Sequence, residues 1–398
     1  MKLARVFDRH WDAFAGGKPY LLTTAHHRAA ASVRACRTAA LGAQVYHCAP
    51  CQRQRLHYHS CHHRACPQCD KHKQHEWAQR QEGKLLDTGY YMLTFTLPEE
   101  LRAVCYTRQR WFYAIMFDAV RDTLKAFDLR HKRLVADGVR NDQTAGFTAV
   151  LHTWTREMLY HPHIHVVMPG LCLTKDGQRI HRPGQADYLM PHRAIAKRFK
   201  ILLRRKIEEH DAAEQRNDLA TIKQTAWEKR WVVDVESVGN GRNVVRYLAR
   251  YVHRTAVSEE RILGTTADGR IRLNCQNSRT KQWRVFSLDP QEFLRRWCLH
   301  ILPKGFTRVR HYGYLSAAAV AKLTQIRNIL QMPDPVPKPK PPPASLPECA
   351  CCKQPMGLLG TFTRHGDWLP APADLFQLWL ATLKARGARA SPTRPATG

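Results

Sequence analysis

The chain has 398 residues, which is enough for two or three domains with hydrophobic cores of their own. Its 63 Lys and Arg against 33 Asp and Glu give a net charge of +30, far more than solubility requires. This excess predicts a polyanionic partner, and a hydrophobic content of 44% excludes a disordered basic tail. The start lacks the apolar stretch of a signal peptide, and no window approaches the length of a membrane span. We therefore expect a cytoplasmic or nucleoid-associated protein that does not enter a membrane.

Six of the 13 cysteines lie between residues 36 and 69, where apolar periodicity is weak outside residues 26–41. In a reducing compartment such a cluster indicates metal binding more than disulfides. Four of the six form two short C-x2-C knuckles, which predict one tetrahedral, structural zinc site made by Cys48, Cys51, Cys66 and Cys69. Three neighbours are spare ligands that could replace one of the four or complete a second site: Cys36, Cys61 and His59.

The pattern of the chain changes after this region. Strands are expected over residues 90–98, 145–154, 161–168, 231–236, 270–275 and 282–288. Helices are expected over residues 101–129, 193–217, 243–255 and 290–301. This order predicts an α+β fold on a mostly antiparallel sheet flanked by helices.

A proline-rich segment over residues 333–347 predicts an extended linker. We expect a zinc-binding, DNA-binding domain over residues 1–80, the main α+β domain over 85–332 and a small C-terminal appendage over 348–398. The appendage has three cysteines that either form half a second zinc site with a histidine such as His365 or are solvated thiols: Cys349, Cys351 and Cys352. The sequence leaves these two interpretations open.

A histidine stripe, His161-Pro-His163-Ile-His165, falls on one of the expected strands. Alternate side chains of a strand share a face, so His163 and His165 can converge on one divalent cation. If the preceding loop is centred near residues 157–158, His152 lies opposite His163 and is a candidate third ligand. Taken alone, such a stripe is more often a set of exposed histidines without a metal.

Tyr247 and Tyr251 stand four residues apart in the expected helix over residues 243–255, so both phenols lie on one helix face. Such a pair alone usually packs in a core. Basic residues that suit a phosphate flank it: Arg246, Arg250 and Arg254. A phenol with a pKa of about 10 is a poor nucleophile at neutral pH, so its attack needs a phosphate that a metal polarises. The histidine strand could hold that metal. Together the two motifs indicate phosphodiester transfer through a covalent tyrosine.

Several segments, in this order, carry a resemblance: CRTAALG, YHCAPC, HSCHHRACPQC, LHTW, HPHIHVVMPG, RYLARYVHR and GFTRVRHYG. Over about residues 20–330 the chain resembles the two-tyrosine HUH transposases of bacterial insertion sequences, of the IS-ninety-one type. The resemblance implies a zinc domain followed by an HUH endonuclease domain. That domain would nick and rejoin single-stranded DNA, at element ends and target, through 5′-phosphotyrosine intermediates in rolling-circle-like transposition. It implies Mg or Mn at His163 and His165, and Tyr247 and Tyr251 as nucleophiles.

Two other functions fit parts of the same evidence. A replication initiator or a conjugative relaxase uses an HUH strand with one or two tyrosines, so its site would not differ. A zinc-dependent DNA-binding protein without catalysis would share the charge and the cysteines, with its histidines and tyrosines as core residues. A DDE transposase is disfavoured, because no spacing among the 33 acidic residues singles out a triad.

Overall fold

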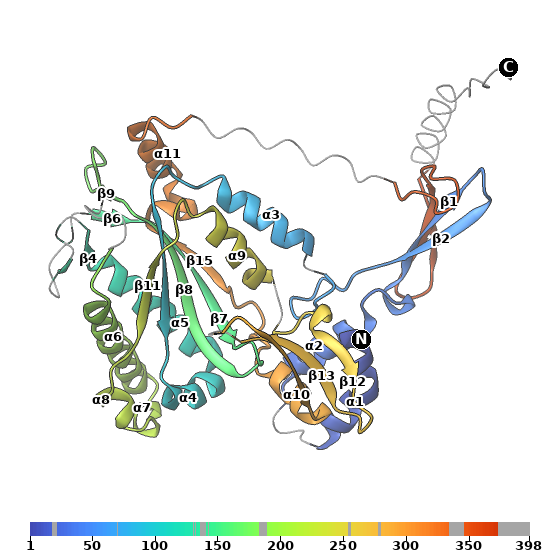
Figure 1. Cartoon of the computed structure of the whole chain (residues 1–398), viewed down its shortest axis with the longest axis horizontal. Helices are drawn as coiled ribbons and strands as arrows, with labels where there is room; N and C mark the ends of the chain where they lie inside the picture. Colours follow the sequence, from blue (N-terminus) through green and yellow to red (C-terminus); the bar gives the residue numbers. More distant parts are fainter. Residues whose placement is uncertain are drawn as a thin grey trace. The chain divides into compact units, whose positions relative to one another are not determined.

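The computed structural model describes residues 1–17, 22–69, 71–129, 131, 133–135, 141, 143–182, 189–253, 256–277, 280–333 and 346–372. Within these ranges, the side chains at positions 71–73, 247, 250, 251 and 253 are outside the description. The chain forms two compact units (Figure 1). The larger unit comprises residues 1–27 and 70–335, and the smaller unit comprises residues 28–69 and 336–398.

These units differ from the expected domain plan at both ends of the chain. Helix α1 (Leu3–Gly17) belongs to the larger unit and not to the unit that contains residues 28–69, because its apolar stripe packs there. Phe7 and Trp11 of α1 contact the ring of Trp297 on helix α10 (Pro290–Cys298). The C-terminal segment is no separate appendage, since strand β16 (Gly357–Phe362) pairs with strand β1 (Ala43–Cys48) in the smaller unit.

The larger unit is built on a five-stranded sheet in which every neighbouring pair is antiparallel, in the order β11-β3-β8-β7-β15. Its strands are β3 (Tyr90–Thr96), β7 (Phe147–Trp154), β8 (Tyr160–Pro169), β11 (Val233–Ser237) and β15 (Val309–Tyr312). The first four correspond to strands expected from the sequence. The predicted α+β class with a mostly antiparallel sheet is therefore confirmed.

The two faces of this sheet pack against different helices. On one face, residues such as Leu93 and Ile164 form the main core with helices α5 (Gln109–Lys125) and α6 (His192–Ala213). The other face packs against helices α3 (Lys71–Glu82) and α9 (Arg242–His253), which lie side by side in Figure 1. The sheet thus has a core face and an α9 face.

The expected helix over residues 101–129 is interrupted. Helix α4 (Arg102–Thr107) ends at Arg108, whose φ of −117° and ψ of 33° are not helical, and α5 follows directly. The Thr107 hydroxyl donates to the backbone oxygens of Ala103 and Val104, a local bond that competes with helix continuation. The helices expected over residues 193–217, 243–255 and 290–301 correspond to α6, α9 and α10.

Shorter elements complete the larger unit. The helices are α7 (Asp218–Thr221), α8 (Thr225–Glu228) and α11 (Val320–Ile329). The strands are β4 (Phe127–Asp128), β5 (Arg133–Leu134), β6 (Gln143–Ala145), β9 (Cys172–Thr174), β10 (Ile180–His181), β12 (Ile262–Thr265), β13 (Ile271–Gln276) and β14 (Trp283–Leu288). Among the helices that the structure describes, none combines the length and apolar composition needed to cross a bilayer.

The smaller unit contains an antiparallel sheet in the order β17-β16-β1-β2, preceded by helix α2 (Thr24–Ala35). Its other strands are β2 (Arg53–Tyr58) and β17 (Trp368–Pro370). Every side chain of β2 is exposed, and a buried cluster near the hairpin turn contains only Cys48, Cys349 and Met356. A cluster of three buried residues supplies little folding energy at this end of the sheet.

Candidate active site

Three histidines meet on neighbouring strands of the central sheet. His152 on β7 is the Cα partner of His163 on β8, and His165 follows two residues later, so all three share one face. This is the register expected from the sequence. The connecting loop maintains it, since the Thr155 hydroxyl accepts backbone hydrogen bonds across the loop and Met158 adopts a φ of 63°.

The ring nitrogens of these histidines converge within 4.8 Å of one another. His163 Nε2 lies 2.9 Å from His152 Nδ1 and 3.1 Å from His165 Nε2. His163 Nδ1 donates to the backbone oxygen of His161 at 2.7 Å, which leaves its Nε2 lone pair facing the other rings. Thr94 Oγ1 lies 3.1 Å from His165 Nδ1 and orients that ring in the same way. Neighbouring ligands of a small octahedral cation lie about 3 Å apart, so the cluster fits a metal.

Burial keeps the three imidazoles uncharged. Their exposed fractions are 6% for His152, 7% for His163 and 8% for His165. Loss of hydration lowers the pKa of His165 to about 4. The same burial, reinforced by the neighbouring rings, holds the pKa values of His152 and His163 well below 6.5. At neutral pH each ring therefore presents lone pairs, which is the form that binds metals.

Helix α9 lies on the sheet face that presents the histidines. Because side chains alternate along a strand, Val150 points to the same side as His152, and Val167 to the same side as His165. Both valines belong to the buried cluster that also contains Leu248 of α9. The α9 face is therefore also the histidine face.

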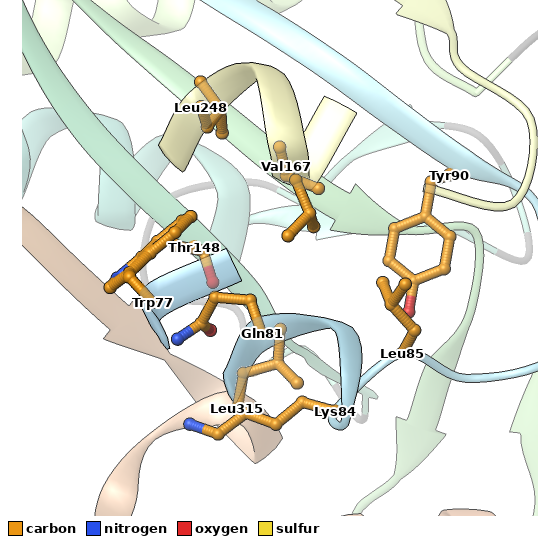
Figure 2. Close-up of a pocket in the computed structure, with 10 residues that line it drawn as sticks. Trp77, Gln81, Lys84, Leu85, Tyr90, Thr148, Val167, Leu248 and Leu315 are labelled. Carbon is orange, nitrogen blue, oxygen red and sulfur yellow. The ribbon is translucent and has the colours of Figure 1, made fainter. Parts of the chain in front are cut away.

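Apolar side chains from α3 and from α9 line one pocket above the sheet (Figure 2). Trp77 of α3, Leu85 just after it and Leu248 of α9 line a pocket together with Val167 and Tyr90 of the sheet. All five belong to the same apolar cluster. This packing holds α9 against the face of the sheet that carries Tyr90, Val150 and Val167.

Both ends of α9 are also attached to the sheet. Before its first residue, Gly241 adopts a φ of 78°, and a Cβ there would lie 2.6 Å from the Tyr90 ring, so this close approach requires glycine. Near its other end, the Arg308 guanidinium donates to the backbone oxygen of Val252 at 3.3 Å. The same guanidinium lies 5.4 Å from the ring centre of Trp154. Arg308 thus connects α9 to the end of β7 that carries the first histidine.

The expected nucleophiles fall on α9. The helix places Tyr247 and Tyr251 one turn apart, but their side chains lie outside the described residues, as does that of Arg250. Arg254 lies outside the described residues altogether. Arg246 is exposed, and its Nε donates to Glu82 Oε1 of α3 at 2.6 Å.

The structure corrects the predicted zinc site, because its four cysteines fall into two clusters. Cys48 and Cys51 lie at the turn of the β1–β2 hairpin, whereas Cys66 and Cys69 follow its open end. The paired strands between these ends span about 17 Å, whereas Zn–S bonds measure about 2.3 Å. One zinc cannot reach both knuckles.

At the open end, each knuckle cysteine joins cysteines that the sequence offered only as spares. The sulfur of Cys69 lies 3.4 Å from that of Cys36 and 3.5 Å from that of Cys61, and Cys66 completes the group. The Cys66 thiol donates to Cys61 and lowers the pKa of Cys61 to about 5, which favours a thiolate. Among the described residues, His59 belongs to neither cluster.

At the turn, Cys48 and Cys51 come together with Cys349 and Cys352 from the C-terminal segment. Of the other C-terminal candidates, Cys351 is exposed and His365 accepts a hydrogen bond from Arg364, so the described structure places neither in a cluster. The sequence left the role of these C-terminal cysteines open. Its C-x2-C spacing at Cys349 was the signal that could have identified them as partners of the first knuckle.

Comparison with known proteins identifies the family. A family model described as "Transposase zinc-binding domain" matches residues 6–97, and one described as "Putative transposase", the two-tyrosine type, matches residues 146–322. The "Putative transposase y4qJ" of Sinorhizobium fredii is 31% identical over 382 residues, which cover 89% of this chain and 93% of that relative. The chain belongs to the two-tyrosine transposase family.

A second relative of this transposase is the "Transposase for insertion sequence element IS801" of Pseudomonas savastanoi pv. phaseolicola. It is 26% identical over 327 residues, which cover 78% of this chain and 75% of the relative. No solved structure matches the chain. The transposase acts on DNA, and the cysteines of its zinc-binding domain fit structural zinc.

Two residues that support the site were missed in the sequence. Thr94 orients His165 from a neighbouring strand, and Arg308 attaches α9 to β7. Neither stands near the histidine or tyrosine motif in the chain. Only the strand register and the packing of α9 bring them to it; Arg308 lies in the GFTRVRHYG segment of the resemblance, but nothing in that segment indicated its contact with α9.

Proposed function

We propose that this transposase nicks and rejoins single-stranded DNA through 5′-phosphotyrosine intermediates, in rolling-circle-like transposition of an insertion sequence. The observation that carries the proposal is the shared sheet face. The helix with Tyr247 and Tyr251 packs on the same face that presents His152, His163 and His165. Nucleophiles and metal ligands from separate elements would then meet at one phosphate.

In the proposed step, the phenol oxygen of one tyrosine forms a bond to phosphorus and the bond to the 3′ oxygen breaks. The products are a tyrosine-linked 5′ end and a free 3′ hydroxyl. A divalent cation held by the three histidine nitrogens would polarise the phosphate and stabilise the leaving oxygen. Nitrogen donors suit Mn²⁺ better than Mg²⁺, which prefers oxygen ligands. The second tyrosine, one turn away on α9, would accept another strand while the first stays bound.

Binding of the DNA backbone is a separate task in this proposal. The net charge of +30 supplies a distributed attraction to phosphates. Arg246, Arg250 and Arg254 are the basic positions on or next to α9 that we propose contact phosphates. For Arg246 this requires exchange of its ion pair with Glu82 for a phosphate.

A nicking assay with matched histidine variants tests the proposal. His163→Ala should reduce Mn²⁺-dependent cleavage of labelled single-stranded element ends to background, because it removes the central ligand. His161→Ala is the control: it lies on the same strand, its ring contacts Arg102, and its backbone oxygen still accepts from His163. This control should cleave like the wild type.

The same preparations should bind DNA alike. Affinity should fall by about a thousandfold or more between 50 and 200 mM salt for wild type and His163→Ala, since phosphate contacts dominate binding. Equal loss of binding and cleavage in His163→Ala would mean that the histidines are structural. Unchanged cleavage in that variant would exclude a catalytic metal at this cluster.

A further inference from the structure

The cysteine cluster at the turn of the β1–β2 hairpin has a metal-ligand geometry and lies only half within the known zinc domain. The sulfurs of Cys48, Cys51, Cys349 and Cys352 lie within 4.8 Å of one another, and those of Cys48 and Cys352 are 3.4 Å apart. Sulfurs around a tetrahedral zinc, at Zn–S distances of about 2.3 Å, lie about 3.8 Å apart. The family match to the zinc-binding domain ends at residue 97 and so does not include the second pair.

The two knuckles have the same local backbone. Each is a C-x2-C segment followed directly by a residue in the left-handed region, Gln52 with a φ of 54° and Lys353 with a φ of 59°. This conformation is uncommon for residues other than glycine and costs free energy, so its occurrence at equivalent positions indicates a shared structural requirement.

The strand pairing explains why these distant segments meet. Strand β1 ends at Cys48 and strand β16 begins at Gly357, and the two strands are antiparallel with His47 opposite Gly357. The segment after β1 and the segment before β16 therefore lie at the same end of the sheet. Backbone bonds from Cys349 N–H to Gln354 O and from Met356 N–H to Pro347 O close the second knuckle there.

Apolar packing is a weak alternative for these cysteines. Cys48 and Cys349 are buried, but Cys51 and Cys352 are partly exposed, and Met356 is the one other buried member of this cluster in the described chain. Four converging thiols with so little apolar surface around them provide little burial energy. A metal would supply that energy, as it does in other small domains.

We propose that Cys48, Cys51, Cys349 and Cys352 bind a second structural zinc, separate from the one held at the open end of the hairpin. This zinc joins the N-terminal and C-terminal parts of the chain. The C-terminal segment is then an integral part of the zinc-binding domain. The proposal does not depend on the nuclease chemistry proposed above.

Thiol labelling of the wild-type, zinc-loaded full chain tests the site without a substitution. N-ethylmaleimide should modify Cys351 quickly, because it is exposed and outside the cluster. Cys51 and Cys352 are accessible enough to react, so their labelling should be at least about tenfold slower only if a metal holds their thiolates. A strong chelator should abolish this protection. Labelling of Cys51 and Cys352 at the rate of Cys351 before chelation would overturn the proposal.

Metal analysis of two variants gives an independent answer. The double variant Cys349→Ser with Cys352→Ser should lose about one equivalent of zinc per chain relative to Cys351→Ser, its matched control from the same knuckle. Cys61 and Cys69 at the other cluster should stay protected from labelling in both. Equal zinc content in the two proteins would refute the second site, and the wild-type labelling decides the question if the double variant fails to fold.

Discussion

His163 acts as the centre of the histidine cluster because each of its ring nitrogens has a defined task. Nδ1 donates to the backbone oxygen of His161, and Nε2 faces both His152 and His165 at about hydrogen-bond distance. Burial removes the protons that would otherwise repel a cation. The His163 ring is therefore already neutral and oriented for metal binding in the metal-free protein.

Protonation of a neighbouring histidine, His300, should make the free energy of unfolding of the larger unit depend on pH. His300 is buried, its Nε2 donates to the Met158 oxygen, and the Thr153 hydroxyl lies 3.2 Å from its Nδ1. Burial lowers the pKa of His300 to about 4. Between pH 6.5 and 4 the unfolded state binds a proton that the folded state does not, so the free energy of unfolding falls as the pH falls, by up to about 3 kcal/mol from this residue.

Urea unfolding at a series of pH values checks this expectation. His300→Gln keeps a side chain able to hydrogen-bond but cannot take up the proton. Its free energy of unfolding should therefore decline less steeply than that of the wild type between pH 6.5 and 4. Parallel pH profiles for the two proteins would show that His300 does not contribute in this way.

The sequence predicted on which face a side chain lies wherever the two-residue period of a strand determines it. The strand period of two placed His163 and His165 on one face, and the hairpin loop placed His152 opposite. Contacts between elements were not predictable in this way. The approach of Gly241 to the Tyr90 ring depends on how α9 packs on the sheet, and no local pattern encodes that.

Helix α9 is held at its start, middle and end, and this attachment is what would present its tyrosines in a constant position. Its middle packs through Val245 and Leu248 on the histidine face. Its C-terminal end is attached through Arg308, which bonds to the Val252 oxygen. We infer that Arg308 positions the helix and does not touch the reacting phosphate.

Replacing Arg308 should separate positioning from binding. Arg308→Met keeps an apolar stem but removes the bond to Val252, so the cleavage rate should fall about tenfold or more. The affinity for the metal should stay unchanged. The affinity for DNA should fall by no more than the loss of one phosphate contact would cause. Arg310→Met is the matched control, because that guanidinium packs over Phe117 on the core face, 4.4 Å from the ring centre. Cleavage kinetics with metal titration would measure both effects. Equal rates for the two variants would contradict a positioning role for Arg308.

The single zinc site predicted from the two cysteine knuckles was wrong. Two C-x2-C pairs close in the chain were predicted to share one zinc, but the hairpin between them separates the pairs by the length of its strands. Each pair instead joins cysteines beyond the motif. Spacing identifies knuckles well, because a knuckle is local; it does not identify which knuckles meet, because that depends on strand pairing such as β1 with β16.

The chain as a whole divides into two units in an order that the linear domain plan did not anticipate. Both units are assembled from two separate stretches of sequence. The change of pattern near residue 85 was visible in the sequence, but the pairing of the C-terminal segment with β1 was not; most of the linker expected over residues 333–347 lies outside the described residues. We propose that the positive charge spread along the chain supplies DNA affinity and that the histidine face of the larger unit supplies the chemistry.

The central claim is that α9 delivers tyrosines to a phosphate at the histidine cluster. Incubation of the transposase with labelled single-stranded element ends and Mn²⁺, followed by nuclease digestion and peptide mapping, should locate a nucleotide on Tyr247 or Tyr251. A single Tyr→Phe variant should still form one adduct, and the double variant should form none, while each Tyr→Phe change alters the stability by no more than about 1 kcal/mol. An adduct that persists in the double variant, or that maps to another residue, would contradict the account.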